Sequence, residues 1–593
     1  MKKIKVRLKF SRLYKKWYIL LSFSLLLAFL LYLLNTSSFL REMELKLVDY
    51  RFRLVPIPER ADSNVVIIAI DDGSLRYFRD NGISWPWPRD FYGYLVDYFT
   101  IGGAAAVLFD MQFYEPDIDR EETYAEETDG AFADAIAANG NVFLGVQLSR
   151  DSLDTDRDLT AFSLPLQNPE ANPGRPFHGL IAPLEIFLAG VNSIGVINVE
   201  PDRDGVLRRV PLIHPLHGLS LPQMAFSAWF NTRVAEKKIR FRQRTLQAGS
   251  RKIPIDAEGN YLINWYGSRG GESPFRYFSF QSVIAAASAH AYGRLPSIPP
   301  TVFRDKYIII GATAAGLLDL KTNPYTKILP GMEIWATSLS NYLQGDFVRS
   351  VPSGIGFLLS WLIIFIIFYA ITHLRALPGN LTLLMLLLLI VAYDFLLWKH
   401  FRILTDLGYH IIGFIVAYLL IVTISFLLEG KSRREIRKIF TRYLHPDVIR
   451  QLEEDPDQVQ LGGEEINATV LYTDIYNFTT ISEKKTPTEL VEDLNRYFQK
   501  LTGMVMNSGG MLDKYTGDGI MALFGVPIAR ADHALLACEA AYAHKVLRRE
   551  LAGKKDLTTD DKLHIMTRTG INSGRLVAGN IGSDKRMDYT AIG

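Results

Sequence analysis

The sequence contains almost no cysteine: Cys538 is the single one in 593 residues. A fold held together by disulfide bonds is therefore excluded, and any large domain must rely on its hydrophobic core. Cys538 lies in the helix-like stretch "HALLACEAAYAHKVL". We expect it to be a small buried residue without a redox role.

The sequence also has little net charge, +2 at pH 7, so its overall balance gives no support to nucleic-acid binding. The charge is unevenly placed, because residues 1–16 form a strongly basic arm directly before the apolar run 17–34. No small-residue cleavage site follows this run. We therefore predict that 17–34 is an uncleaved membrane anchor and not a signal peptide.

Later apolar runs are also long enough to cross a hydrocarbon core of ~30 Å, and with the first they predict four transmembrane helices in contact with membrane lipid. Basic segments before the first run and after the last place both ends in the cytoplasm by the positive-inside rule. A multi-pass protein of the inner (cytoplasmic) membrane follows, with a domain on each side. The predicted segments are 1–16, 17–34, 41–350 (outside), 354–372, 380–398, 409–428, 429–460 (connecting helix) and 461–593 (inside).

Charged residues near the spans give two further expectations. Lys399 and Arg402 lie on the predicted outer side, in minor conflict with the positive-inside rule. Asp394 lies near the outer end of its span, which predicts an interfacial carboxylate in place of a transport site.

The amphipathic segment 429–460 is expected to pair with a copy of itself and to pass on motion.

Residues 41–350 alternate strand-like runs, such as "NVVIIAI", with helix-like stretches, such as "PRDFYGYLVDYFTIGG". This alternation predicts an α/β fold with a buried, largely parallel sheet. The acidic stretch 114–130 is predicted to be a solvated loop, with a cation site left open. Candidate signal-binding residues are Trp85, Trp87 and Arg89 in "WPWPR", where simple packing of the tryptophans is favoured, and Asp110, Asp319 and Glu333 near strand or loop ends.

Several separated stretches of this segment, among them "VVIIAIDDGSL", "AAAVLFDMQFYEPD" and "GVINVEPDRDGVLRRVPL", resemble a CHASE-type sensor domain of the second class. In that family the sensor lies between one N-terminal span and three later ones, which is the order predicted here. The resemblance implies that the domain receives an extracytoplasmic signal, whose identity stays unknown.

The C-terminal segment places two carboxylates at special positions. "NATVLYTDIYNFTTISE" predicts a strand that presents Asp474 at its end, and "MLDKYTGDGIMALFG" predicts a hairpin whose turn presents Asp518 between glycines. With the amphipathic helix between them, this order predicts an α+β, ferredoxin-like (palm-type) domain with the two carboxylates side by side. Close carboxylates repel unless they are protonated or bind metal. Oxygen ligands suit Mg²⁺ or Mn²⁺, two per site, with a triphosphate completing the coordination.

Four motifs, "VLYTDIYNFTTISE", "DKYTGDGIMALFG", "TRTGINSGRLVAGNIGS" and "MDYTAIG", resemble in order and spacing the class III nucleotidyl cyclase catalytic domain over 461–593. The resemblance implies roles for individual residues. Asp474 and Asp518, with the Ile475 carbonyl, match the metal ligands, and Arg568 matches an arginine that contacts the triphosphate. Lys514 and Thr590 match the purine-selecting positions, and Phe478 and Thr479 match substrate-binding positions.

The resemblance implies an adenylate cyclase, which converts ATP to cyclic AMP and pyrophosphate by attack of the ribose 3′-hydroxyl. A lysine can donate to N1 of adenine and a hydroxyl can accept from the exocyclic amine, whereas guanylate-making relatives carry Glu at the position of Lys514. A homodimer is implied as well, because in this family the metal-binding and purine-selecting residues come from different protomers.

Other interpretations stay open. Beyond "YTAIG" the family pattern continues with an Asp, an Asn and an Arg, so we expect this chain, which stops at Gly593, to be impaired or inactive, as a silent receptor would be. A guanylate cyclase is the second alternative, and Lys514 weakens it. A diguanylate cyclase is suggested by "LGGEEI" (461–466), but that motif is expected before the first strand and outside any hairpin, as a chance match.

Overall fold

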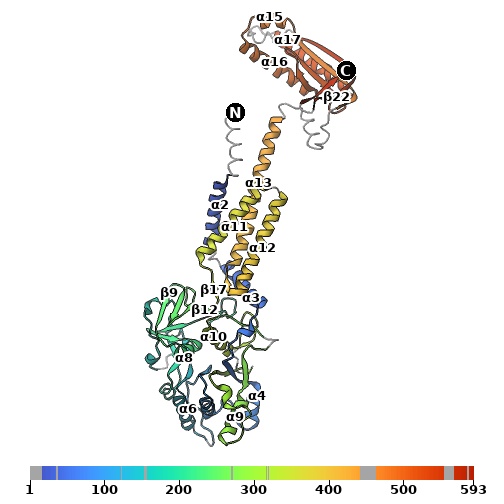
Figure 1. Cartoon of the computed structure of the whole chain (residues 1–593). Coiled ribbons are helices and arrows are strands. Elements are labelled where there is room, and N and C mark those ends of the chain that lie inside the picture. The colour runs from blue at the N-terminus through green and yellow to red at the C-terminus, as the bar shows by residue number, and fades with distance from the viewer. Residues whose placement is uncertain are drawn as a thin grey trace. The chain divides into compact units, whose positions relative to one another are not determined.

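The chain folds into two compact units, one of residues 12–424 and one built from residues 425–593. Figure 1 shows the order of their elements along the chain. The structure is a computed structural model and describes residues 16–34, 38–121, 123–151, 157–268, 272–314, 317, 320–374, 376–440, 462–552, 567–583 and 586–593.

The first unit contains an α/β domain around a mostly parallel sheet, in the strand order β13–β1–β14–β2–β3–β4, with β5 also paired to β3. Every residue of β1 and β2 is buried. Such apolar runs without polar alternation are typical of a sheet that is covered on both faces, and the predicted α/β class is confirmed. The strands are β1 Val65–Ile70, β2 Ala106–Phe109, β3 Val142–Ser149, β4 Gly179–Ile181, β5 Ser193–Val196, β13 Arg276–Ser279 and β14 Tyr307–Ala312.

Alternate residues of β1 enter two different cores: Val65 and Ile67 lie in one, and Val66 and Ile68 in the other. The helices on the two faces follow this division. Those in the core of Val66 are α4 Asp72–Asp80, α5 Asp90–Gly102, α6 Ala125–Asn139, α7 Glu185–Leu188 and α9 Phe280–Ala291, and those in the core of Val65 are α8 Met224–Arg233 and α10 Met332–Gln344.

Smaller strand pairs surround the main sheet. They are β6 Arg209–Pro211 with β12 Asn260–Leu262, β7 Ile213–Leu216 with β8 Leu219–Pro222, β10 Thr245–Ala248 with β9 Ile239–Arg242 and β11 Arg251–Pro254, β15 Leu320–Lys321 with β16 Leu329–Pro330, and β17 Arg349–Ser350 with β18 Ile403–Leu404. The last pair ties the end of the α/β domain to the connection between the last two apolar helices.

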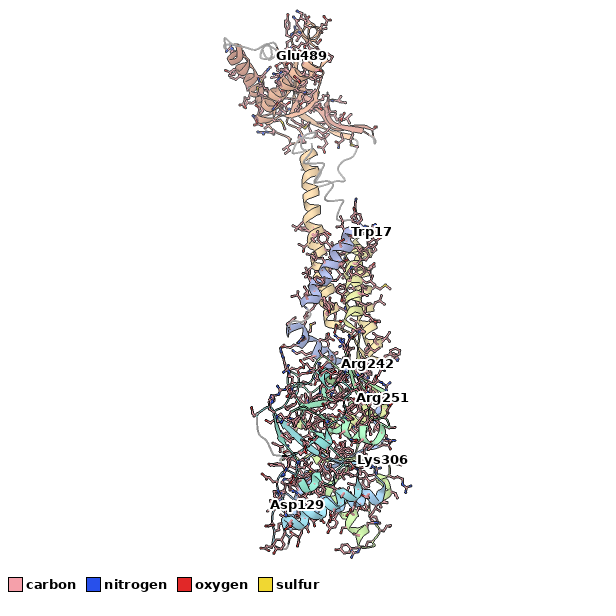
Figure 2. The ribbon with its side chains drawn as sticks, turned by 90° about the vertical axis from the view of Figure 1, so that its left-hand side faces the viewer. Trp17, Asp129, Arg242, Arg251, Lys306 and Glu489 are labelled. Atoms are coloured by element: carbon pink, nitrogen blue, oxygen red, sulfur yellow. The ribbon has the colours of Figure 1, made fainter. Side chains whose placement is uncertain are left out.

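The prediction of a solvated loop over 114–130 is wrong only from Ala125 onward, because the described residues before it lie outside any helix and are mostly exposed. Helix α6 begins at Ala125, inside the predicted loop. Asp129 (Figure 2) accepts a hydrogen bond from Arg89 Nη1 at 2.7 Å, and Asp117 accepts from the Arg89 backbone N–H at 2.9 Å. Arginine contacts, and not solvent alone, thus balance the acidic side chains.

Among the described residues, four helices are long and apolar enough to cross a membrane. Their apolar side chains share one core, which includes Ala28, Ile364, Leu383 and Ala417, and Figure 1 shows the helices side by side. The predicted membrane protein with four transmembrane helices is confirmed. The helices are α2 Trp17–Leu34, α11 Ser353–His373, α12 Ala376–Phe401 and α13 Leu407–Phe440.

Helix α13 continues without a break through the fourth span into the predicted connecting helix. Residues 429–440 thus belong to the same helix as the span, and not to a separate one. The remainder of the predicted connecting helix, residues 441–460, lies outside the described residues.

Helix α3, Ser38–Leu54, is joined to the apolar helices by a buried ion pair. Asp394 in α12 is 4% exposed and accepts two hydrogen bonds from Arg51, at 2.8 and 2.9 Å. Arg51 also donates to Glu44 at 2.9 Å, and the second oxygen of Glu44 accepts from the backbone N–H of Gly408, in the first turn of α13. The charge of Asp394 is thus stabilised by a buried guanidinium and not by water, and its position at the membrane interface stays a prediction.

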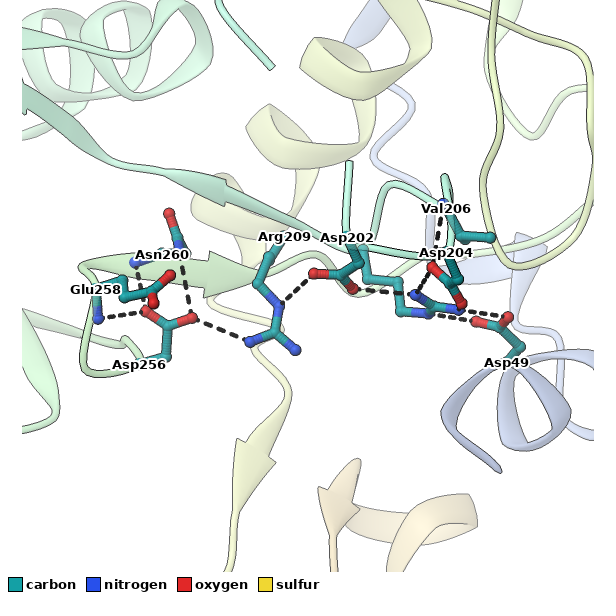
Figure 3. Close-up of polar contacts among 9 residues, drawn as sticks. Asp49, Asp202, Asp204, Val206, Arg209, Asp256, Glu258 and Asn260 are labelled. Atoms are coloured by element: carbon teal, nitrogen blue, oxygen red, sulfur yellow. Dashed lines mark hydrogen bonds and ion pairs between the residues drawn. The ribbon is translucent and has the colours of Figure 1, made fainter. Parts of the chain in front are cut away.

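The same helix is joined to the α/β domain two residues earlier. Asp49 accepts two hydrogen bonds from Arg208, at 2.6 and 2.8 Å, and Arg208 also donates to Asp202 and Asp204 at 2.7–3.0 Å (Figure 3). The Arg208 side chain is 0% exposed. A buried arginine is stable only when its donors are matched, and the three carboxylates match them.

The second unit is an α+β domain. Its strands have the order β20–β21–β19–β22–β23. Alternate residues of β21 enter opposite cores, Ile520 and Ala522 with the helices, and Met521 and Leu523 on the other face. The predicted α+β class and hairpin are confirmed. The elements are β19 Gly462–Ile475, α15 Phe478–Ser482, α16 Pro487–Asn507, β20 Met511–Tyr515, β21 Ile520–Phe524, α17 His533–Ala552, β22 Thr567–Ser583 and β23 Arg586–Ile592.

Two expectations for this unit need correction. The strand β19 begins at Gly462, so "GGEEI" lies within the strand and not before it; it is still not a hairpin turn. Cys538 in α17 is exposed, not buried. The predicted helix α16 is confirmed, and it begins with a capping box in which Thr486 and Glu489 (Figure 2) satisfy each other's backbone N–H groups.

Candidate functional site

The first candidate ligand, Asp474, lies at the second-last position of the long strand β19. The adjacent strand β22 places Arg568 directly opposite it. The Arg568 guanidinium lies over the ring of Tyr476, 4.5 Å from its centroid, which fixes the direction of this long side chain. The end of β19 therefore presents a carboxylate beside a held cation.

The second candidate ligand, Asp518, lies in the turn between β20 and β21. The backbone N–H after the turn, that of Ile520, donates to Thr473 Oγ1 at 3.0 Å, so the turn is fastened to the end of β19. Burial raises the pKa of Asp518, and the neighbouring carboxyl group of Asp474 raises it further. The structure thus brings the two predicted carboxylates together.

The two positions beside Asp518 require glycine for different reasons. Gly517 has φ +87°, a conformation that side chains disfavour. At Gly519 a Cβ atom would lie 1.7 Å from the carbonyl oxygen of Thr473, so only glycine allows the turn to approach β19 this closely.

Replacement of Gly519 is therefore expected to separate the two carboxylates. Gly519→Ala should lower the free energy of unfolding by about 1–3 kcal/mol, because the added methyl group must push the hairpin away from Thr473. Gly503→Ala in helix α16 is the matched control: a Cβ there meets nothing within 4 Å, and alanine favours helix. Thermal unfolding of both variants measures the difference, and equal melting temperatures would contradict the close approach.

The donor set is suited to a hard divalent cation bound together with its substrate. Within the described part of the chain, no group of three or more His, Cys, Asp and Glu side chains gathers as a complete metal site. Two carboxylates at a strand end and a turn are instead the incomplete set that Mg²⁺ uses when substrate phosphates supply the remaining ligands. Ile475, the third predicted ligand, has a buried side chain, so it has only its backbone carbonyl to offer a cation.

The predicted purine-selecting residues meet at a third side chain. Thr590 donates a hydrogen bond to Asp513 Oδ2 at 2.5 Å, and Lys514 Nζ lies 3.8 Å from the same oxygen. Strands β20 and β23 are at opposite ends of the hydrogen-bonded order, so the sheet must curl for these side chains to meet. Asp513 was not predicted; its position beside Lys514 was visible in the sequence, but the contact depends on this curl.

Phe478 and Thr479 form the first turn of α15, directly after Asn477, which has φ +54°. Phe478 is half-buried against the helix-side core, and Thr479 is exposed. This turn begins three residues after the end of β19, so both residues follow Asp474 closely, at the same end of this central strand.

The candidate residues of the α/β domain do not form one cluster. Trp87 is buried against Phe78 and Phe280, and Trp85 packs edge-on against Trp87, 5.0 Å between ring centroids. Arg89 is held by Asp129. These contacts give the three residues structural partners within the domain.

The remaining candidates lie elsewhere. Glu333, at the start of α10, accepts a hydrogen bond from Tyr277 at 2.7 Å, and burial raises its pKa. Asp110 follows β2, and its backbone N–H donates a hydrogen bond to the carbonyl oxygen of Ile310 in β14. Asp319 lies outside the described residues.

Two family models match the chain. A model described as "CHASE2 domain" matches residues 24–372, more than half of the chain, and one described as "Adenylate and Guanylate cyclase catalytic domain" matches residues 463–592. The chain is 33% identical to Adenylate cyclase 1 of Rhizobium meliloti (strain 1021) over 168 residues, 28% of this chain and 25% of the relative. It is 29% identical over 165 residues to an uncharacterized protein of Mycobacterium tuberculosis (strain H37Rv), 28% of each chain.

The match thus spans about a quarter of the length of the curated relatives. Among solved structures, the guanylyl cyclase Cya2 is 36% identical and the adenylyl cyclase CyaB from P. aeruginosa 33%, each with a TM-score of 0.20 over 22% of this chain and 66% or 68% of the other. Taken with the α/β fold and the two carboxylates, the family models lead to one conclusion: the chain belongs to the CHASE2-domain proteins and carries a class III adenylate/guanylate cyclase catalytic domain.

Proposed function

We propose that the protein is a membrane-bound adenylate cyclase, which converts ATP to cyclic AMP and pyrophosphate under the control of its CHASE2 domain. The observation that carries the proposal is the close approach of the turn that holds Asp518 to Thr473, the residue before Asp474. Adenylate cyclase 1, the relative named above, supports the choice of reaction class.

In the proposed reaction the ribose 3′-oxygen forms a bond to the α-phosphorus while the bond from that phosphorus to pyrophosphate breaks. The hydroxyl proton is lost to solvent. Asp474 and Asp518, with the Ile475 carbonyl, would hold two Mg²⁺ or Mn²⁺ ions, which when bound supply charge neutralisation at the phosphates and a lower pKa for the attacking hydroxyl. Arg568, held by the ring of Tyr476, would carry positive charge to the departing phosphates.

Assembly and location complete the proposal. A homodimer would join the metal-binding residues of one protomer to the purine-selecting residues of its partner. The CHASE2 domain would face the outside of the inner membrane and the cyclase domain the cytoplasm, as the basic segments at the two ends indicate. An extracytoplasmic signal would then act on the membrane helices, whose fourth member runs on to Phe440.

The experiment is a turnover assay in membranes or detergent, with Mn²⁺ and either ATP or GTP, in which the cyclic nucleotide is measured. The full-length protein assayed is one that includes the Asp, Asn and Arg expected beyond Gly593. Formation of cyclic AMP with ATP preferred to GTP is expected. A clear preference for GTP would replace the adenylate assignment by a guanylate cyclase, and no product from either nucleotide would refute the proposed activity.

Lys514 tests the choice of base. Lys514→Glu should lower kcat/KM for ATP by about 10²-fold and shift the ratio toward GTP, because a carboxylate accepts from the N1–H of guanine and repels N1 of adenine. Lys500→Glu, on the helix α16 of the same domain, is the control for a reversed charge and should leave the ratio unchanged. If the ratio of kcat/KM for ATP to that for GTP were unchanged in Lys514→Glu, Lys514 would not contact the purine base.

A further inference from the structure

Three side chains meet where β20 approaches β23: Asp513, Lys514 and Thr590. The Thr590 hydroxyl donates to Asp513 Oδ2 at 2.5 Å, and the Lys514 ammonium group lies 3.8 Å from the same oxygen. The Asp513 side chain is 1% exposed, whereas that of Lys514 is 46% exposed. A buried carboxylate therefore contacts both residues that recognise the purine base in the proposed function.

The backbone has an irregularity at this point. Leu512 pairs with Ala522 and Lys514 pairs with Met521, so Asp513 is the extra residue of a β-bulge. In a regular strand the side chains of 513 and 514 would point to opposite faces of the sheet. A bulge re-aims side chains, and here it lets Asp513 and Lys514 approach each other.

The hydrogen bond to Asp513 determines whether the Thr590 hydroxyl can donate to a ligand or only accept from it. A free hydroxyl can either donate or accept, so by itself it does not distinguish an amine from a carbonyl. Once its only hydrogen is donated to Asp513, the oxygen offers lone pairs alone. Adenine presents an N6 amine, a donor, where guanine presents O6, an acceptor. The fixed hydroxyl therefore accepts a hydrogen bond from the N6 amine of adenine. With guanine, its lone pairs would face those of O6, and no hydrogen bond could form.

We propose that Asp513 is a specificity-determining positioning residue of the nucleotide site. It holds the proton of Thr590, so that the hydroxyl meets the purine only as an acceptor, and it keeps the Lys514 ammonium group beside that hydroxyl. The inference rests on the proposed function and deepens it: a threonine selects adenine here because a neighbouring carboxylate removes its ability to donate.

The test measures kcat/KM of the full-length protein for ATP and for GTP with Mn²⁺. Asp513→Asn keeps the size of the side chain but can donate to Thr590, which frees the hydroxyl to turn. The ratio of ATP to GTP kcat/KM should fall by about tenfold or more, the effect of one misplaced polar contact. Because the ratio is taken within one preparation, a loss of folded protein does not alter it.

Asp588→Asn is the matched control, since Asp588 is an exposed carboxylate whose charge acts on Asp513 and which has no hydrogen bond to Thr590. Its ratio should stay within about twofold of wild type. Asp513→Asn combined with Thr590→Asp should regain the preference for ATP, because a carboxylate at 590 accepts without help. If Asp513→Asn does not fold, Asp513→Ser takes its place. Its side chain is smaller, and the same fall in the ATP-to-GTP ratio of kcat/KM is expected.

An unchanged ATP-to-GTP ratio in Asp513→Asn and Asp513→Ser would overturn the inference while leaving the proposed cyclase intact. If the wild-type protein forms no cyclic nucleotide, the proposed function fails by itself, and the same ratio measured as Kd for ATP and GTP with Mn²⁺ still decides the role of Asp513. Binding of neither nucleotide would overturn both.

Discussion

Asp518→Asn is expected to reduce cyclic AMP formation by the full-length protein by ~10³-fold or more, because it removes one of two carboxylates that hold the divalent cations. The change keeps the size of the side chain and so isolates its charge. Asp474→Asn should have an effect of the same order. Turnover with Mn²⁺-ATP is the measurement, and titration of Mn²⁺ into each variant by calorimetry is an independent one.

The same substitution should not destabilise the domain. Burial and the nearby Asp474 raise the pKa of Asp518, so ionisation of this carboxyl group costs more free energy in the folded than in the unfolded protein. A neutral side chain removes that cost, and without metal the melting temperature of Asp518→Asn should equal or exceed that of wild type. Asp532→Asn, an exposed residue paired with Arg530, is the control and should retain activity. Activity close to wild type in Asp518→Asn would refute the assigned site.

Arg208→Met is expected to lower the free energy of unfolding of the CHASE2 domain by about 3–5 kcal/mol. The buried guanidinium is the shared partner of Asp49, Asp202 and Asp204, and its removal leaves these carboxylates close together without their shared cation. Methionine fills much of the same volume, so the loss reports charge and not a cavity. Thermal unfolding and resistance to protease of the full-length protein are the measurements.

The adjacent residue provides the control. Arg209 contacts Asp202 and Asp256 (Figure 3), but its side chain is 35% exposed. Arg209→Met should therefore cost only about 0–1 kcal/mol, as exposed ion pairs do. If the two variants unfolded at the same temperature, the Arg208 cluster would not stabilise the domain through its burial.

The apolar pattern of the sequence was enough to predict the α/β class, the four transmembrane helices and the hairpin around Asp518. Continuous runs such as Val65–Ile70 are buried on both faces, and the glycines beside Asp518 signal a turn. These features are local, because each depends on residues that are neighbours in the chain. The pairing of Asp474 with Asp518 was predictable for the same reason, since one strand and one hairpin position both.

Contacts between distant segments were not predictable in this way. Asp394 pairs with Arg51, 343 residues away, and nothing in the span around Asp394 indicates that partner. The contact of Asp513 with Thr590 depends on a bulge and on the curl of the sheet. The end of the acidic stretch was interpreted as a loop because Arg89, the partner of Asp129, lies in another segment.

Helix α3 has consequences for how a stimulus can travel. Asp49 and Arg51 point in different directions from one helical turn, and each ends in a buried guanidinium–carboxylate pair, one with Arg208 of the α/β domain and one with Asp394 of α12. Such a doubly anchored helix behaves as a rigid strut, whereas a flexible tether would absorb small movements. A shift of the α/β domain should thus reach α12 and the first turn of α13 as a displacement of similar size, without any intermediate that unfolds.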